Sequence, residues 1–422
     1  MSERGISRRE FAKSAVAIGG TAALAACLDR GAPEAPEGGD PESLPDRQHA
    51  WDAFSASDDA GNTRLSRHHV LLLLDYEREG APTEGDRGQV EDALRSLERA
   101  YGWQTDGLMF TLGYSPAYFE RFDAEPADVD LPDPAALAPF EDPAFDTPDA
   151  LLHLASDHEH VVLAAEEALK GNRGTINGAE MAATFEGVFD VADRRTGFVG
   201  AGLPAENQDV DGIPDSEPVP EDAPLFMGFK SSFDGNQASE DRVTVESGPF
   251  AGGATQHLSR IRLHLQQWYE QDSRDQRVSK MFCPAHADEN RVEGTGENLG
   301  TDSGIEDCGE DVVESSRREG VVGHAQKLSR ARDEDGPRLL RRDFDSTDGG
   351  EAAVHFLSLQ RSIADFVATK SMMNGTDVAD ESAVGQQVNN GILQYMTVER
   401  RGNYLLPPRD LRALPPADPD PA

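Results

Sequence analysis

The stretch GHAQKLSRARDEDGPRLLRR, from Gly323 to Arg342, places one histidine seventeen residues before a pair of arginines. The run GGEAAVHFLSLQRSIADF follows almost at once, from Gly349 to Phe366. Its apolar pattern predicts a strand followed by a helix. One candidate metal ligand, two cations and a strand–helix unit therefore lie close together in the chain.

The segment before this region predicts an α+β unit. HHVLLLLDYE at His68–Glu77 predicts a buried strand, and QVEDALRSLERAYGW at Gln89–Trp103 repeats apolar residues at helical spacing. We expect a second strand from Gly107 onward, and a third strand followed by a helix across Asp149–Leu169. The order strand, helix, strand, strand, helix is that of a ferredoxin-like unit.

The second half of the chain predicts a weaker repeat of the same plan, so the fold class is α+β with two ferredoxin-like units. About 350 residues are more than one core usually holds, which favours two domains. The expected organisation is a signal at 1–27, a disordered acidic linker at 28–66, a first unit at 67–180, a second unit at 181–410 and a disordered tail at 411–422.

Together these segments resemble the dye-decolorising peroxidase family. In that family an iron-ligating histidine is followed by Leu-Arg-Arg and then by a strand ending in Phe-Gln-Arg, and His324 stands seventeen residues before Arg341, as the family keeps it. A Gly-Tyr turn with Ser-Pro after the second strand, here Gly113–Pro116, is a second likeness. The resemblance implies that the two units pack as a dimeric α+β barrel-type fold that holds haem b (iron protoporphyrin IX), with 181–410 as the haem-binding half.

The resemblance also assigns site residues. His324 is expected to ligate the haem iron, and Arg341 to contact the cofactor and stabilise charge as the O–O bond of peroxide breaks. Arg260, on a strand that looks like the family's basic strand after a paired glycine, is expected to contact the haem. The surroundings of His324 depart from the family, because Gly323 replaces the usual serine and no Asn-Pro-Arg follows.

The proton-transferring aspartate of the family is matched less well. The family has a Gly-Phe-x-Asp-Gly loop, whereas MGFKSSFDGNQ at Met227–Gln237 separates Gly-Phe from Asp-Gly by three extra residues. Asp234 is the acid in this loop that is able to take the role. GFVGAG at Gly197–Gly202 is a rival with no acid, and Asp234 is equally explained as a turn residue before glycine.

The implied function is a haem peroxidase that reduces hydrogen peroxide and oxidises an unknown reductant. Electron transfer through Trp268, Tyr269 or Tyr395 would serve a reductant too large for a buried pocket, although each aromatic residue is equally explained as core. Two alternatives stay open. The first is a haem-binding or iron-handling lipoprotein of the same fold without turnover, and the second is a structural lipoprotein with a generic ferredoxin-like fold.

The N-terminus predicts export and a lipid anchor. SRREFAK at Ser7–Lys13 places a twin arginine before a short apolar stretch, which is typical of substrates of the twin-arginine translocase. Leu-Ala-Ala-Cys ends that stretch, so Cys27 is expected to be lipidated and to hold the protein at the outer face of the cytoplasmic membrane. The bland alternative is an ordinary secreted protein cut nearby.

The charge balance limits the partners. Asp and Glu number 78 against 39 Lys and Arg, an excess typical of proteins that fold in high salt. Such a chain repels phosphates, which argues against nucleic acid as a partner. The sequence leaves the oligomeric state open.

Two further cysteines, Cys283 and Cys308, remain. Outside the cytoplasm a disulfide between them is favoured, since it would close a polar, glycine-rich loop. The alternative joins both cysteines with His286 in a metal site, but a convincing fourth ligand is missing.

Overall fold

β1 (His68–Tyr76) is the strand around which the first half of the chain is built. The computed structural model describes residues 34–58, 61–229, 236–292, 308–309 and 311–419, and every structural statement concerns these. Strand residues alternate between two faces. Leu72 and Leu74 pack in the core beneath the helices, whereas Leu71 and Leu73 pack with residues of the second half of the chain.

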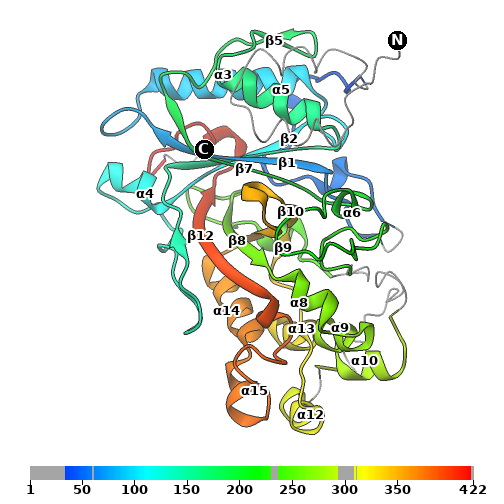
Figure 1. The fold of residues 1–422 in the computed structure, drawn as a ribbon. Coiled ribbons are helices and arrows are strands. Elements are labelled where there is room, and N and C mark those ends of the chain that lie inside the picture. Colours follow the sequence, from blue (N-terminus) through cyan, green and yellow to red (C-terminus); the bar gives the residue numbers. More distant parts are fainter. Residues whose placement is uncertain (1–33, 59–60, 230–235, 293–307, 310, 420–422) are drawn as a thin grey trace, which may run out of the picture.

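The first unit is ferredoxin-like, as predicted. Its elements are β1, α3 (Glu84–Ala100), β2 (Met109–Tyr114), β4 (Ala150–Ser156), α5 (Glu159–Leu169) and β7 (Phe189–Phe198), with strand order β7-β1-β4-β2. α3 and α5 cover the outer face of these strands (Figure 1). The boundary expected at residue 180 is wrong, because β7 pairs along the whole of β1 and completes this unit.

α3 shows why the sequence folds in this way locally. Thr83 and Asp86 form a reciprocal capping box, which satisfies backbone N–H groups at the start of the helix. Val90, Leu94 and Leu97 then fall on one face and are fully buried.

The second unit repeats the plan. Its elements are β8 (Ala254–Leu263), β9 (Leu340–Arg341), β11 (Ala353–Gln360), α14 (Ile363–Asn374) and β12 (Met396–Leu406), with strand order β12-β8-β11-β9. β11 and α14 are the strand and helix expected after Gly349. The crossover from β8 to β9 contains α8 (Leu265–Glu270), α9 (Arg274–Met281), α10 (Pro284–Asp288), α12 (Val312–Glu319) and α13 (His324–Leu328).

The two units join at both edges, so the sheet closes on itself. β2 pairs with β12 through Tyr114 and Leu405. On the other side β10 (Phe344–Ser346) pairs with β11 and, through Asp345 and Phe198, with β7. The remaining short elements are β3 (Ala144–Phe145), β5 (Thr175–Ile176), β6 (Ala179–Glu180), α4 (Pro116–Phe119), α6 (Leu203–Glu206), α7 (Glu240–Val243) and α15 (Thr376–Glu381).

The expected disordered linker and tail are largely folded. The described part of 28–66 begins at residue 34, and within it Trp51 is 2% exposed, with its indole N–H donating to the Gln48 carbonyl. In the tail, Leu414 is fully buried and its N–H donates to the hydroxyl of Tyr114 at 2.7 Å. Composition predicted disorder here, but these acidic segments bury a few large side chains against the sheet, which outweighs their polarity.

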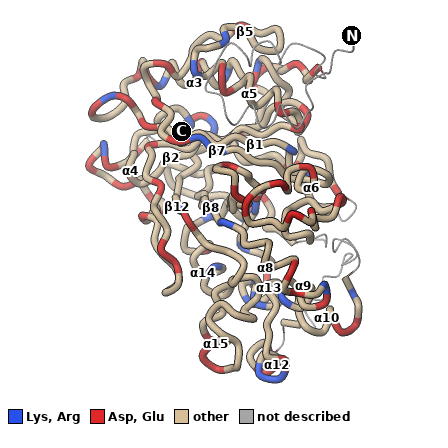
Figure 2. Tube along the Cα trace, viewed as in Figure 1, with Lys and Arg blue, Asp and Glu red and all other residues tan. Residues whose placement is uncertain are grey.

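Acidic residues are spread over the loops and helices of both units, with fewer basic residues between them (Figure 2). No helix in the described part of the chain is both long and apolar enough to cross a membrane. The predicted signal and Cys27 lie outside the described residues.

Candidate active site

A cavity of about 820 Å³ lies between the sheet of the second unit and the helices that cover it. Ile261 and Leu263 of β8 and Val354 and Phe356 of β11 form part of its wall. The helices contribute residues of α13 and α14. Residues of β9 and β10 also line the cavity. In Figure 1, α13 lies well below these two strands. Its size and apolar walls are those of a cofactor site.

His324 is the first residue of α13 and lines this cavity. The helix start is fixed by Gln326, whose side chain accepts from the Gly323 N–H and whose own N–H donates to the Phe282 carbonyl at 3.1 Å. A Cβ at Gly323 would lie 1.8 Å from that carbonyl oxygen. Glycine therefore replaces the family's serine because the backbone of Phe282 packs directly against this position.

The imidazole of His324 is neutral and available. Burial, followed by the charges of Lys327, Arg341 and Lys370, lowers the pKa of His324 to about 3. Neither ring nitrogen has a hydrogen-bonding partner among the described residues. A neutral imidazole with a free lone pair, facing a cavity, is what ligation of a metal requires.

Arg341 also lines the cavity, from the end of β9. The side chain of Gln237 accepts from the backbone N–H of Arg341 at 3.0 Å. The Arg341 side chain is 30% exposed, and its nearest carboxylate among the described residues, Asp343, lies 3.8 Å from the guanidinium group. That separation is longer than a hydrogen bond, so the guanidinium group keeps donors for an anion in the cavity.

Arg342, the second arginine of the pair, is structural. Its guanidinium group lies 3.9 Å from the ring centroid of Trp51 and donates to the His49 carbonyl at 2.6 Å. The residue ties the N-terminal segment to the sheet.

Two carboxylates in the wall, Asp343 and Asp345, were missed by sequence reasoning. Burial raises the pKa of Asp343 to about 6 and holds the pKa of Asp345 well above its usual range. The signal was the alternation of Asp343, Phe344 and Asp345 directly after the arginine pair. That pattern places both acids on the same face of a strand.

The expectation for Arg260 is wrong. On β8, Ile261 lines the cavity, whereas Arg260 points to the opposite face of the strand and is not among the cavity residues. It forms an ion pair with Glu399 and donates to the Asp348 carbonyl at 3.1 Å. Its basic character serves ion pairing inside the closed sheet.

Asp234 lies outside the described residues, and its role stays a prediction. The residues on either side of that segment, Phe229 and Asn236, both line the cavity.

The aromatic residues predicted as electron carriers lie beside the cavity wall. Trp268 packs edge-on against Tyr395, with ring centroids 4.9 Å apart, and against the cavity-lining Phe229 at 6.2 Å. The hydroxyl of Tyr395 donates to Asp272, and Lys280 Nζ donates to the same carboxylate. Tyr269 donates to the Phe226 carbonyl at 2.6 Å.

Cys283 and Cys308 form the predicted disulfide. Cys283 follows Phe282, which contacts the start of α13. At the other end of that helix Gly309, next to Cys308, lies against Ser329, since a Cβ on the glycine would be 2.6 Å from the serine hydroxyl. The disulfide therefore joins two segments that contact opposite ends of the helix carrying His324. His286, the third residue of the alternative metal site, is buried beside the disulfide.

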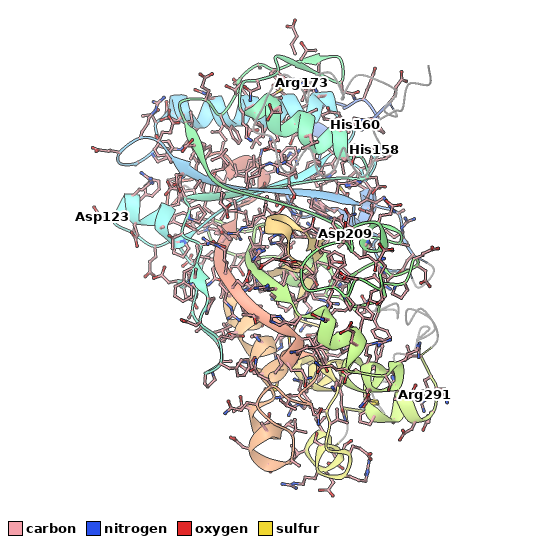
Figure 3. All side chains as sticks on the ribbon, in the orientation of Figure 1. Asp123, His158, His160, Arg173, Asp209 and Arg291 are labelled. Atoms are coloured by element: carbon pink, nitrogen blue, oxygen red, sulfur yellow. A yellow bond between two sulfur atoms is a disulfide. The ribbon has the colours of Figure 1, made fainter. Side chains whose placement is uncertain are left out.

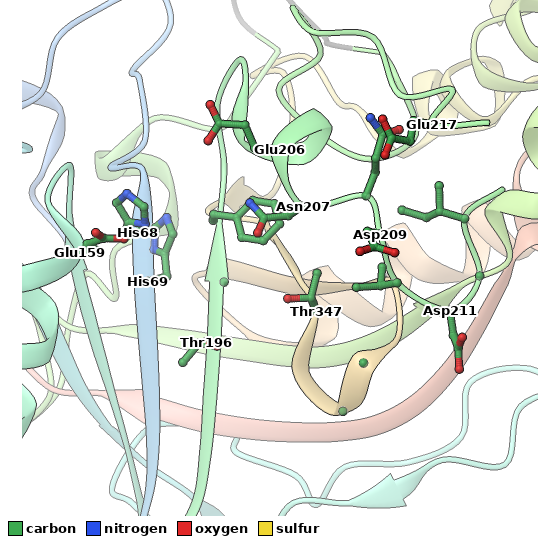
Figure 4. Close-up of a pocket in the computed structure, with 18 of the residues that line it drawn as sticks. His68, His69, Glu159, Thr196, Glu206, Asn207, Asp209, Asp211, Glu217 and Thr347 are labelled. Carbon is green, nitrogen blue, oxygen red and sulfur yellow. The ribbon is translucent and has the colours of Figure 1, made fainter. Parts of the chain in front are cut away.

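A second cavity, of about 1050 Å³, is lined by acidic side chains (Figure 4). Glu206, Asp209, Asp211 and Glu217 face it, with His68 at one end. His158 and His160 lie near that end, at the start of α5 (Figure 3), with ring centroids 5.4 Å apart.

Comparison with protein families gives a match over residues 66–408, to a family described as a family of unknown function, DUF7405. The chain belongs to this family. The match covers both ferredoxin-like units and every described residue of the cavity wall from Arg67 onward. No curated relative of this DUF7405 chain was found by sequence.

Solved structures similar to this DUF7405 member are dye-decolorising peroxidases. A putative Dyp-type peroxidase from Shewanella oneidensis has a TM-score of 0.53 at 14% identity, covering 83% of this chain and 95% of that one. A DypB variant from Rhodococcus jostii, solved in complex with heme, has a TM-score of 0.51 at 14% identity, with 87% and 99% covered. The encapsulated Dyp-type peroxidase from Mycobacterium smegmatis has a TM-score of 0.50 at 17% identity, with 85% and 97% covered. The chain has the Dyp-type fold.

Proposed function

We propose that this protein is a haem peroxidase that reduces hydrogen peroxide with electrons from a reductant. The observation that carries the proposal is His324, a neutral histidine without a described partner, facing a cavity that also holds the guanidinium group of Arg341. The Dyp-type fold supports it, because the similar Rhodococcus jostii structure is a complex with heme.

The residues present fit haem b. His324 would hold the iron through a ring nitrogen, and the apolar walls from β8 and β11 would flank the macrocycle. Arg338, which lines the same cavity, would pair with a carboxylate of the porphyrin. When bound, haem supplies the electron transfer to peroxide that no protein side chain performs.

The chain's own residues would position the peroxide and manage its charge. Arg341 would donate hydrogen bonds to peroxide and stabilise the negative charge that develops as the O–O bond breaks. Gln237 would fix the backbone of Arg341 through their 3.0 Å hydrogen bond. Asp234 is the sequence's candidate for carrying a proton between the two oxygens. The apolar wall would exclude water from the reacting pair.

Electrons would reach the site from a reductant at the surface or inside the cavity. The contact of Tyr395 with Trp268, and of Trp268 with Phe229, leads from the Asp272 carboxylate to the cavity wall. A tyrosine whose hydroxyl proton has a carboxylate acceptor is suited to lose an electron, because the proton has somewhere to go.

A second candidate, a haem-binding protein of the same fold without turnover, is favoured by one observation. Ligating histidines usually donate their second ring N–H to a carboxylate or carbonyl, which increases their donation to the metal. His324 has no such partner among the described residues.

One spectrum distinguishes the two candidates. The protein, purified in high salt and reconstituted with haem, should show a Soret band that changes on adding hydrogen peroxide and recovers with a reductant. A band that peroxide leaves unchanged supports the second candidate. Failure to bind haem contradicts both.

We also propose export by the twin-arginine translocase and anchoring through lipidated Cys27, on the motifs at Arg8–Arg9 and Leu24–Cys27. Replacing both arginines with lysine should leave precursor in the cytoplasm, whereas Cys27→Ser should release the protein into the medium. Cell fractionation and immunoblotting measure both outcomes. Unchanged membrane association of both variants would rule out this route.

A further inference from the structure

Asp343 presents one carboxylate oxygen to the cavity beside Arg341. It lies between β9 and β10, and its Oδ1 accepts from the Leu357 N–H at 3.1 Å. Its Oδ2 stands 3.8 Å from Nη1 of Arg341 and makes no hydrogen bond to a described residue. The side chain is 16% exposed and lines the cavity. One oxygen is therefore held in place and the other is available.

The acidity of Asp343 suits proton exchange near neutral pH. Burial raises its pKa to about 6, while Arg341 and the Leu357 N–H act in the opposite direction. The charged groups that face it are Arg341 and Asp345. Burial, together with the charge of Asp343, holds the pKa of Asp345 well above its usual range.

We propose that Asp343 is the catalytic acid–base residue of this cavity; the proposal rests on the haem peroxidase function above. Oδ2 of the ionised carboxylate accepts a proton from one oxygen of hydrogen peroxide, while Arg341 stabilises the resulting anion. The same proton is then returned to the outer oxygen, which leaves with the bonding electron pair as water. Two electrons from the reductant and two protons from solvent complete the reduction of peroxide to two waters, and Asp343 ends ionised as it began.

Geometry favours Asp343 over the neighbouring carboxylate. Asp345 lies in β10, and its Oδ2 accepts from the N–H of Phe226, which is in the segment before α7. Asp343 is the ionisable carboxylate that the described residues place next to the guanidinium group of Arg341. Asp234 is the rival predicted from sequence, and the experiment separates the two.

The test uses the haem-loaded full chain. Stopped-flow measurement of the Soret change after mixing with hydrogen peroxide, from pH 4.5 to 8, compares wild type with Asp343→Asn, Asp343→Glu, Asp234→Asn and Asp92→Asn. Loss of a general acid–base residue lowers rates by about 10²–10⁴-fold. We expect that loss in Asp343→Asn, together with loss of the rate increase near pH 6, and partial rescue in Asp343→Glu. Asp92, an exposed acid on the outer helix α3, is the control and should leave the rate unchanged.

Asp343→Asn at the wild-type rate and pH profile overturns the proposal while leaving the peroxidase function intact, as does a rate loss confined to Asp234→Asn. Haem content is read from the same spectra, and rates are compared per haem in case a variant binds less. Absence of any peroxide reaction in wild type overturns the peroxidase function itself.

A second readout needs no turnover. Carboxyl ¹³C NMR of the haem-free protein, assigned by difference from Asp343→Asn, should give a titration near pH 6 that moves upward in Arg341→Leu, because the guanidinium group favours the ionised carboxylate. A titration in the ordinary range of aspartate, about 4, that is the same in wild type and in Arg341→Leu also overturns the proposal.

Discussion

At the scale of single residues, His324 and Arg341 have different tasks within one cavity. His324 is uncharged because burial depresses its pKa to about 3, and it therefore offers a lone pair to a metal. Arg341 presents a guanidinium cation, and its closest acid among the described residues is 3.8 Å away. The first residue is suited to holding iron and the second to stabilising an anion.

These tasks predict different losses on substitution. His324→Ala should abolish most haem binding, measured as the Soret absorbance per protein after reconstitution. Arg341→Leu should bind haem normally but react with peroxide more slowly by about 3 kcal/mol, or roughly 10²-fold, the usual effect of losing a charge-stabilising donor. Wild-type occupancy and spectrum in His324→Ala would falsify the assignment of the ligand.

Gly323 supports His324 by leaving room for a neighbouring backbone. Gly323→Ala puts a methyl group where the Phe282 carbonyl lies 1.8 Å away, so α13 must shift. We expect a lower melting temperature and weaker haem affinity, measured by thermal unfolding and haem titration.

Gly88→Ala is the matched control for that substitution. Gly88 lies inside α3, with nothing within 4 Å of the added methyl group, and should gain up to about 1 kcal/mol of stability. Equal behaviour of the two variants contradicts the crowding argument.

At the scale of elements, α13 has five residues, which is too short for a stable isolated helix, and its position depends on its contacts. Phe282 lies at its start and Gly309 at its end, and the disulfide joins the segments that carry them. The crossover between β8 and β9 thus holds the ligand helix from both sides.

Removing the disulfide should therefore loosen α13 more than the rest of the fold. Cys283→Ser with Cys308→Ser is expected to cost about 3 kcal/mol, as for other loops of this length, and to weaken haem binding. Hydrogen exchange of the haem-free protein, followed by mass spectrometry, should speed up in residues 324–329 and stay unchanged in α3. Uniform acceleration across the chain instead indicates a purely global effect.

The sequence predicted which helices and strands exist better than it predicted where the ordered units begin and end. The strand of His68–Tyr76 and the strand–helix of β11 and α14 follow from apolar periodicity alone. The prediction that Arg260 contacts haem was wrong because a likeness in sequence does not say which face of β8 a residue occupies. Trp51 and Leu414 are buried within segments whose composition predicts disorder, since a few aromatic and aliphatic anchors are invisible to averages. Asp343 was missed because its significance comes from Arg341 and Leu357 lying around it.

At the scale of the whole molecule, buried histidines make stability depend on pH. Burial lowers the pKa of His49, His69 and His257 to about 3 in the folded state, against about 6.5 when unfolded. Between these values the unfolded chain binds more protons, so their contribution is complete above pH 6.5 and is lost as pH falls toward 3.

Denaturant unfolding at constant salt should therefore give a free energy that falls below pH 6.5, by up to about 1.4 kcal/mol per pH unit for each histidine. His257→Gln removes one such group and should flatten the slope. A slope that His257→Gln does not change contradicts this origin of the acid sensitivity.

β10 is only three residues long, yet it bridges β7 and β11 and so completes the ring of strands. Edge strands have unpaired backbone N–H and C=O groups, and strands of other chains are able to pair with them, which leads to aggregation. In the described part of this chain the long strands of the ring have neighbours on both sides, and the short β9 has a neighbour on one side. A break at β10 would expose the edges of β7 and β11 together. We expect a molecule broken there to self-associate through these two exposed strand edges.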